Sequence, residues 1–288
     1  MKVLHKIILI LSVLAALAAA MVYDAFYASV NRFAVRYETL SSIYIPEQMN
    51  DVTILFFSDL DYGTFMNSRR LGKLVDTVNE LCPDIVIFGG DLFDNDVPYI
   101  SAGFTQEITD GLKRMKAPLG KFAVMGDFDY RNAYTEKTVR QILYDADFEL
   151  LYNSSVLLRN TGSSSVALTG IDSGLNGHPD INAAFANISR AAYNLVICHT
   201  PDTASDVPAD LTDYYITGHS HGGQAYWFLG ALYTPEMAEE FFRGKTSVRD
   251  IFTVDISYGV GTTVKDVRFL CSAEVVLYRL RHEEILSQ

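Results

Sequence analysis

Short, continuous apolar runs separated by helical patterns are the feature that most constrains the fold of this chain. The runs occupy residues 52–57, 85–88, 122–124 and 195–198. Because they are apolar throughout rather than at alternate positions, we expect strands that are buried on both faces. Between the first two runs, residues 68–81 carry apolar side chains at helical spacing, and Cys82-Pro83 is expected to end that helix. This order of strand, helix and strand predicts an α/β fold with a largely parallel sheet.

The second half of the chain has a different pattern. A helix is expected over residues 135–147, with Thr135 as a possible N-cap. Around residues 154–170 and 251–280, strand patterns follow one another directly, which predicts antiparallel or mixed pairing. A chain of 288 residues is long enough for one large domain, or one large domain with a small extension.

The first 30 residues differ in character from the rest. Lys2 and Lys6 precede an apolar run over residues 7–22, and Asp24 is the first acidic residue. Such a run is typical of a cleaved signal peptide, for which residues 18–20 offer small side chains, or of an uncleaved anchor that continues to Ala28. We favour a transmembrane signal anchor over residues 1–30; a buried core helix is the remaining alternative. The basic end predicts a single-pass protein of the cell membrane, with the rest of the chain outside the cytoplasm.

Composition limits the class of partner. The chain has 35 acidic and 23 basic residues, for a net charge of −12. This balance argues against binding to duplex nucleic acid, which requires a basic face. An anionic substrate would instead need a local positive charge such as a metal ion. The three cysteines are far apart, and we expect Cys82 and Cys198 to be buried thiols.

Metal-ligand residue types follow the four apolar runs and a fifth short run over residues 215–217. In open α/β sheets, side chains just beyond the carboxyl ends of strands meet in one crevice. Glycines before three of these segments permit the tight turns that bring side chains to a common point. The segments contain Asp59 and Asp61; Asp91 and Asp94; Asp127 and Asp129; His199; and His219 and His221.

Each of these segments alone is a weak signal. An isolated Asp-x-Asp is more often an Asx turn, and an isolated buried histidine is more often structural. The segment Gly218-His219-Ser220-His221-Gly222 is stronger, because paired imidazoles framed by glycines have few structural uses. All five segments together, each at a strand exit, predict a metal site.

The five segments resemble those of the calcineurin-like metallophosphoesterases, especially a membrane-anchored bacterial branch. That family shows D-x-H, G-D-x-x-D, G-N-H-D/E, a lone H and G-H-x-H, in this order, and here the resemblance covers about residues 50–280, including a Gly-rich stretch that ends at Arg268. It implies a two-sheet mixed β sandwich flanked by helices for the metallophosphoesterase domain, residues 31–288. It also implies two metal ions and a bridging hydroxide that attacks phosphorus.

The resemblance assigns roles to individual residues. Asp59, Asp91 and His221 match ligands of the first metal, with Asp91 as the bridge, and His199 and His219 match ligands of the second. Three positions depart from the family pattern. Asp61 stands where the family has His, Asp127 where it has Asn, and Phe128 where it has the His that assists the leaving group.

The first two departures keep the capacity to bind metal and change its electrostatics. The predicted ligand set is Asp59, Asp61, Asp91, Asp127, His199, His219 and His221. Four carboxylates would offset two divalent cations, which makes the metals weaker Lewis acids. Fewer nitrogen donors favour Mn²⁺ or Mg²⁺ as the two divalent cofactors, with Fe or Zn²⁺ possible.

Phe128 bears on catalysis, because phenylalanine cannot donate a proton. The substrate could have a leaving group that needs no protonation, or Tyr62, Tyr130 or His178 could donate instead, or hydrolysis could be lost. Asp129, which in the family orients the missing His, is kept as a catalytic candidate with an open role.

We predict hydrolysis of phosphodiester or pyrophosphate bonds in a phosphorylated small molecule or lipid. The alternative is a metal-binding ligand-recognition protein of the same fold; the oligomeric state is left open.

Overall fold

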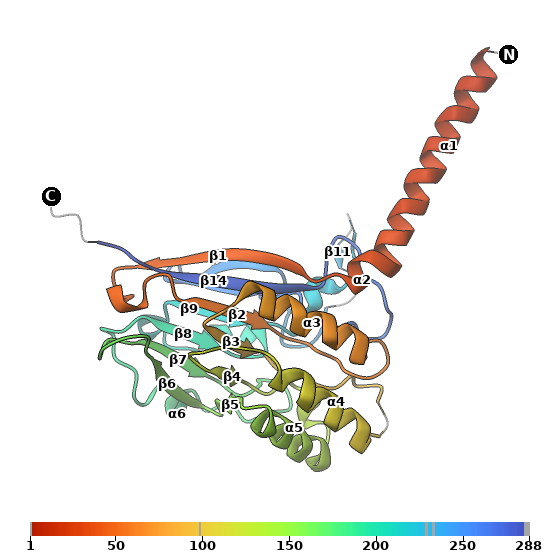
Figure 1. Cartoon of the computed structure of the whole chain (residues 1–288). Helices are drawn as coiled ribbons and strands as arrows, with labels where there is room; N and C mark the ends of the chain where they lie inside the picture. Colours follow the sequence, from red (N-terminus) through yellow and green to blue (C-terminus); the bar gives the residue numbers. More distant parts are fainter. Residues whose placement is uncertain (1, 98, 228–229, 232–233, 285–288) are drawn as a thin grey trace.

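Two six-stranded mixed β-sheets, stacked face to face, form the body of the molecule (Figure 1). The computed structural model describes residues 2–97, 99–227, 230–231 and 234–284. The first sheet has the order β1-β14-β2-β3-β4-β5, and all neighbours are parallel except β14 and β2. Its strands are β1 (Ala34–Ser42), β2 (Thr53–Phe57), β3 (Ile85–Phe88), β4 (Lys121–Ala123), β5 (Glu149–Leu150) and β14 (Glu274–His282).

The second sheet has the order β12-β13-β9-β8-β7-β6, with antiparallel pairs at both edges and parallel pairs between them. A two-stranded hairpin, β10 (Tyr226–Trp227) with β11 (Gly230–Ala231), lies outside it. The strands of the second sheet are β6 (Ser154–Leu158), β7 (Val166–Gly170), β8 (Asn194–Ile197), β9 (Tyr214–Thr217), β12 (Gly244–Val248) and β13 (Phe252–Ile256).

Buried apolar side chains form three layers. Between the sheets, Ile54 and Ile87 of the first sheet pack in one cluster with Leu195 and Ile216 of the second. The helices α3 (Ser68–Leu81), α4 (Ala102–Lys113) and α5 (Ala133–Asp145) cover the outer face of the first sheet (Figure 1). The short helices α6 (Ile181–Phe185), η4 (Pro201–Ser205) and η5 (Ala209–Leu211) cover the outer face of the second sheet. The predicted sandwich flanked by helices is therefore confirmed.

Local predictions are mostly confirmed, with two corrections. The four apolar runs form β2, β3, β4 and β8, and the helix over 68–81 has the predicted bounds. Thr135 is not an N-cap: α5 begins two residues earlier, and the Asn132 side chain accepts the Thr135 N–H at 2.9 Å. Cys198 is buried, but Cys82 is exposed because it lies just past the end of α3 with a left-handed φ of 48°. The helix α4 was not predicted, since two glycines interrupt its apolar pattern.

The N-terminal segment projects from the body as one long helix (Figure 1). It consists of α1 (Lys2–Tyr23), the π-helical turn η1 (Asp24–Ala28) and α2 (Ser29–Asn31). Residues 2–31 are long and apolar enough to cross a membrane by length and composition. No residue of α1 is buried, so the core-helix alternative is wrong.

Candidate metal centre

The seven predicted ligands come from the two sheets in a simple division. All four aspartates follow strands of the first sheet: Asp59 and Asp61 after β2, Asp91 after β3, and Asp127 after β4. All three histidines follow strands of the second sheet: His199 after β8, and His219 and His221 after β9. Every one of the seven is buried. The sandwich therefore brings a row of carboxylates against a row of imidazoles.

Four of these residues form a tight group. The ligand atoms of Asp91, Asp127, His199 and His219 all lie within 4.8 Å of one another. His199 Nε2 is 3.1 Å from both Asp91 Oδ2 and Asp127 Oδ1, and His219 Nδ1 is 3.0 Å from Asp127 Oδ1. Ligand atoms bound at 2.0–2.1 Å to one octahedral cation are separated by about 3.0 Å at right angles. The observed spacings are those of atoms around a shared ion.

In two of the imidazoles, the hydrogen bond of the nitrogen that points away from the carboxylates indicates which ring nitrogen is free to bind a metal. His199 Nδ1 lies 2.7 Å from the carbonyl oxygen of Gly89, and His219 Nε2 lies 2.7 Å from that of Glu236. A carbonyl oxygen can only accept, so His199 Nδ1 and His219 Nε2 carry the protons. When these rings are neutral, His199 Nε2 and His219 Nδ1 therefore present lone pairs to the carboxylates. Lone pairs 3.0–3.1 Å from carboxylate oxygens repel unless a cation or a proton lies between them.

A second, looser group adjoins the first. His221 Nε2 lies 3.5 Å from Asp61 Oδ2 and 3.7 Å from Asp59 Oδ1. Asp59 Oδ1 is also 3.9 Å from His199 Nε2, which places it between the two groups. The Asp59 carboxylate is held by the backbone N–H of His219 at 3.0 Å and by the hydroxyl of Ser58.

Unpaired polar atoms test whether the cluster suits a metal. Among the described residues, both carboxylate oxygens of Asp61, together with Asp127 Oδ1 and His199 Nε2, are buried without a hydrogen-bond partner. The last two lie close together but lack the direction of a hydrogen bond. Buried polar groups are rarely left unpaired, because this costs about 1–3 kcal/mol each. Four such atoms in a cluster of four carboxylates and three imidazoles fit a pair of divalent cations.

The backbone at the cluster is unusual. Five of the seven residues have left-handed φ angles between 47° and 68°, which cost non-glycine residues roughly 1–2 kcal/mol each. Such strain persists where the surrounding structure imposes it, and it concentrates at functional sites. The five residues are Asp59, Asp61, Asp91, His219 and His221.

Two glycines let the β3 and β4 loops approach each other. A Cβ on Gly126 would lie 2.1 Å from Asp91 Oδ1 and 2.3 Å from Asp91 N. Gly90, with φ of 97°, packs against the backbone N of Gly126 in the same way. Only residues without side chains permit this contact, which sets Asp91 beside Asp127.

Protonation follows from burial and from the charges in the cluster. Burial raises the pKa of Asp91 to about 7 and that of Asp61 well above its usual value, and neighbouring carboxylates add to both shifts. Burial opposes a charge on His199, but Asp91 and Asp127 raise its pKa well above the ordinary value. Without a metal, protons must therefore take up the negative charge. Burial lowers the pKa of His221 to about 4, so that ring is neutral at pH 7.

Asp129 lies beneath the cluster rather than in it. Its carboxylate accepts the backbone N–H groups of Gly126, Leu92 and Asp91 at 2.8, 2.9 and 3.1 Å. These bonds tie the β3 loop to the β4 loop. The geometry assigns Asp129 to positioning the backbone that carries Asp91 and Asp127.

Two of the three candidate replacement proton donors, the tyrosines, donate hydrogen bonds to other carboxylates. The Tyr62 hydroxyl donates to Glu107, and the Tyr130 hydroxyl donates to Asp172 at 2.6 Å. His178 is exposed on a loop. Phe128 lines a cleft of about 390 Å³ whose wall also includes Asp127, His219 and His221. An apolar ring thus occupies the wall where the family carries its histidine.

Arg268 supports the second group from behind and is completely buried. Its guanidinium donates to the carbonyl oxygens of Tyr258 at 2.6 Å and His221 at 3.2 Å, and to those of Gly259 and Gly261. It lies 3.4 Å from His221 Nδ1, where its charge disfavours protonation of that ring. In the sequence, only the resemblance of residues 257–268 to the family pattern points to this arginine.

A comparison with protein families bears on this site. The model of the calcineurin-like phosphoesterase family matches residues 52–223, which run from the start of β2 to the end of the turn η6 (His221–Gly223). This range contains all seven residues of the cluster. It is more than half of the chain.

Curated relatives and one solved structure are also similar. The uncharacterized metallophosphoesterase YkuE of Bacillus subtilis is 26% identical over 84% of this chain and 84% of its own length. A transmembrane protein with metallophosphoesterase domain from Danio rerio is 27% identical over 80% of this chain, which spans about half (53%) of that relative. A dimetal phosphatase from Danio rerio aligns with a TM-score of 0.42 at 10% identity, covering 73% of this chain and 88% of that one. That last likeness is too slight to support an argument about the site.

Proposed function

Because the chain belongs to the calcineurin-like phosphoesterase family, a class of phosphoester hydrolases, we propose that it hydrolyses phosphodiester or pyrophosphate bonds with a pair of divalent metal ions. The observation that carries this proposal is the orientation of His199 and His219. Both rings donate to backbone carbonyls on one side and face carboxylates on the other. Backbone carbonyls are frequent partners of metal-ligating histidines, because they fix the tautomer that binds.

The proposed ligand sets follow the two groups of side chains. Asp91, Asp127, His199 and His219 would hold one ion. Asp59, Asp61 and His221 would hold the other, with Asp91 shared between the two as the family resemblance implies. The excess of carboxylates favours Mn²⁺ or Mg²⁺. Bound ions would supply Lewis-acid activation of water, including the bridging hydroxide that the resemblance implies.

The side chains of the cleft favour a substrate whose leaving group departs without a proton. Phe128 occupies its wall, and Tyr62 and Tyr130 donate to Glu107 and Asp172 instead. Burial raises the pKa of both tyrosines above its usual value, so neither is a ready acid. Pyrophosphates and activated diesters meet this condition, since their leaving groups are stable anions.

The N-terminal segment defines the proposed location. We assign residues 1–30 to a single-pass membrane anchor and residues 31–288 to the hydrolase domain. Lys2 and Lys6 at the free end favour an anchor whose N-terminus stays in the cytoplasm and a domain that lies outside.

One observation supports a second candidate function. Phe128 stands where the family has a histidine, and a side chain that acts as a general acid contributes about 10²- to 10⁴-fold to catalysis. A cluster that binds metal without turnover would make the protein a metal-dependent ligand-recognition module.

A turnover assay separates the two functions. The full chain in detergent, loaded with Mn²⁺, is tested on bis(p-nitrophenyl) phosphate, p-nitrophenyl phosphate and an alkyl pyrophosphate. We expect turnover of the diester or the pyrophosphate, and a loss of at least about 10³-fold in Asp91→Asn, because the shared ligand is removed. Asp76→Asn, an exposed position on α3, is the matched control and should behave like the wild type. Bound metal without turnover of any substrate would favour the recognition module.

A further inference from the structure

A series of adjoining cavities connects the metal cluster with the membrane helix. The cleft at the cluster shares His221, Thr263 and Val264 with a second cavity of about 280 Å³. This second cavity shares Ala225 and Val267 with a third, of about 380 Å³. The third cavity is bordered by residues of the anchor helix between Ala18 and Phe26. The path therefore runs from His221 to a helix that is long and apolar enough to span a bilayer.

The lining changes along this path from polar to apolar. Of the cluster, Asp127, His219 and His221 line the cleft, together with the polar residues Asn95, Asp96 and Glu236. In the third cavity every lining residue that the structure describes is apolar: Ala18, Met21, Val22, Ala25, Phe26, Ala225, Val267 and Phe269. Lys265 lines the cavity between them. A ligand that fills the path would have an anionic head at the metals and a hydrocarbon chain toward the anchor.

Hydrogen bonds hold the walls of the path in place. The backbone N–H of Arg268 donates to the carbonyl of Ala25 at 2.9 Å, while its guanidinium donates to the carbonyl of His221. The Gln224 side chain donates to the carbonyls of Thr263 and Lys265 at 2.9 and 2.8 Å. One buried arginine therefore fixes the end of the anchor relative to the metal cluster. The cavity is built before a ligand arrives, which lowers the entropy lost on binding.

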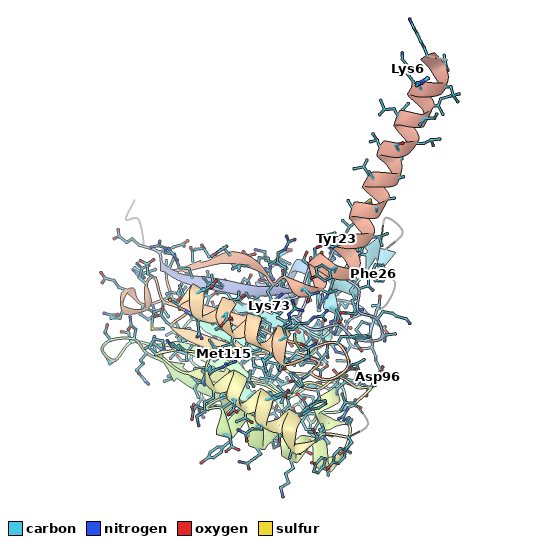
Figure 2. All side chains as sticks on the ribbon, turned by 45° about the vertical axis from the view of Figure 1, so that its right-hand side comes forward. Lys6, Tyr23, Phe26, Lys73, Asp96 and Met115 are labelled. Carbon is cyan, nitrogen blue, oxygen red and sulfur yellow. The ribbon has the colours of Figure 1, made fainter. Side chains whose placement is uncertain are left out.

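The far end of the path lies at the level expected for the bilayer surface. Figure 2 shows Lys6 near the free end of α1, and Tyr23 and Phe26 where the helix meets the domain. Tyr23, Phe26 and Tyr27 are 52–60% exposed, and aromatic side chains of this kind gather at the membrane interface. Residues 263–269 form the strip that borders the path. Val264 on this strip and Leu270 just after it are about two-thirds exposed. A water-soluble substrate would have no use for an apolar cavity at this place.

We infer that the substrate is a membrane lipid with a phosphodiester or pyrophosphate head, whose hydrocarbon chain lies between the anchor helix and the strip of residues 263–269. The inference rests on the proposed hydrolase function and adds its substrate class. Each methylene that moves from water into such a cavity contributes about 0.8 kcal/mol, or about fourfold in binding. The anchor is then part of the substrate site as well as a tether.

A chain-length series tests this inference. The full chain in detergent, loaded with Mn²⁺, is assayed with p-nitrophenyl phosphodiesters that carry an ethyl, hexyl or decyl group. Their common leaving group needs no proton, so Phe128 does not enter the comparison. We expect kcat/KM to rise at least about 100-fold from ethyl to decyl. Ala18→Trp, which fills the third cavity, should reduce that ratio at least about tenfold.

A control variant and a crosslinking measurement separate filling of the third cavity from a general effect of a tryptophan on the helix. Ala20→Trp makes the same change on a different face of the exposed helix, away from the cavity, and should leave the chain-length ratio unchanged. A decyl phosphonate with a terminal diazirine, which requires no turnover, should crosslink to peptides that contain residues 18–26 or 263–269.

The hydrolase function and the lipid substrate are contradicted by different results. No turnover of any diester or of the alkyl pyrophosphate refutes the hydrolase. Turnover without chain-length dependence, or with the same dependence in Ala18→Trp, refutes only the lipid substrate. An oligomer broken by Ala18→Trp, with no crosslink to the path, would show that a second copy of the anchor helix fills the cavity and would also refute it.

Discussion

Replacing Asp129 by asparagine should show whether this residue positions the cluster or takes part in catalysis. Its carboxylate accepts three backbone N–H groups, two on Oδ2 and one on Oδ1. The asparagine oxygen can keep the two bonds of Oδ2, but the new amide NH₂ then faces the N–H of Leu92. One hydrogen bond to a charged group is lost, worth about 1.5–3 kcal/mol, and buried donors are left unpaired.

The net effect is smaller than the sum of these losses. Burial raises the pKa of Asp129, which shows that its ionised form is costly to desolvate, and neutral asparagine avoids that cost. We therefore expect a loss of about 2 kcal/mol in the free energy of unfolding, or about 4–8 °C in Tm. Because Asp91 and Asp127 lie on the two loops that Asp129 joins, Mn²⁺ affinity should fall about 10- to 100-fold.

Two measurements on the Asp129→Asn variant distinguish a positioning role from a catalytic one. Urea unfolding gives the stability, and titration calorimetry with Mn²⁺ gives the affinity, each compared with Asp76→Asn as an exposed control. If Asp129→Asn keeps wild-type stability and Mn²⁺ affinity but loses turnover, Asp129 acts on the reaction itself and the positioning argument is wrong.

Three further changes test separate parts of the site. Gly126→Ala places a Cβ about 2 Å from Asp91 and should cost about 1–3 kcal/mol in urea unfolding and weaken Mn²⁺ binding; wild-type values would contradict the close contact. Phe128→His should raise turnover of an alkyl phosphodiester at least about tenfold and change that of a p-nitrophenyl diester little; equal effects on both would refute a missing acid. With a chelator present, unfolding free energy should fall as pH rises from about 6.5 to about 8, because Asp91 and His199 have pKa values raised above those of the unfolded chain and the native state binds more protons. Excess Mn²⁺ should reverse this slope by displacing those protons, and the same slope with and without Mn²⁺ would contradict the account.

The sequence predicted the parts of the fold that depend on local patterns. Continuous apolar runs identified β2, β3, β4 and β8, since strands buried on both faces need no polar alternation. The same runs located five of the seven cluster residues, and a further short run over residues 215–217, now β9, located His219 and His221, because the carboxyl ends of these strands meet at one edge of each sheet. Which sheet each residue belongs to, aspartates on one and histidines on the other, depends on long-range pairing that no local pattern contains.

Other features of the site were not predictable for physical reasons. Positive φ at Asp59, Asp61 and His219 is uncommon for residues other than glycine, and it arises because the loops are held from both sheets. The hydrogen bonds from His199 and His219 go to main-chain carbonyls, which have no sequence signature. The parallel pairing of β1 with β14 joins residues about 240 positions apart, and it places the first strand after the anchor beside the last strand of the chain.

Anomalous diffraction at the manganese edge, from crystals of the full chain grown with Mn²⁺, tests the central claim most directly. We predict two peaks in each molecule. One should lie among Asp91, Asp127, His199 and His219, and the other among Asp59, Asp61, Asp91 and His221. A single peak, or manganese bound away from His199 and His219, would contradict the account.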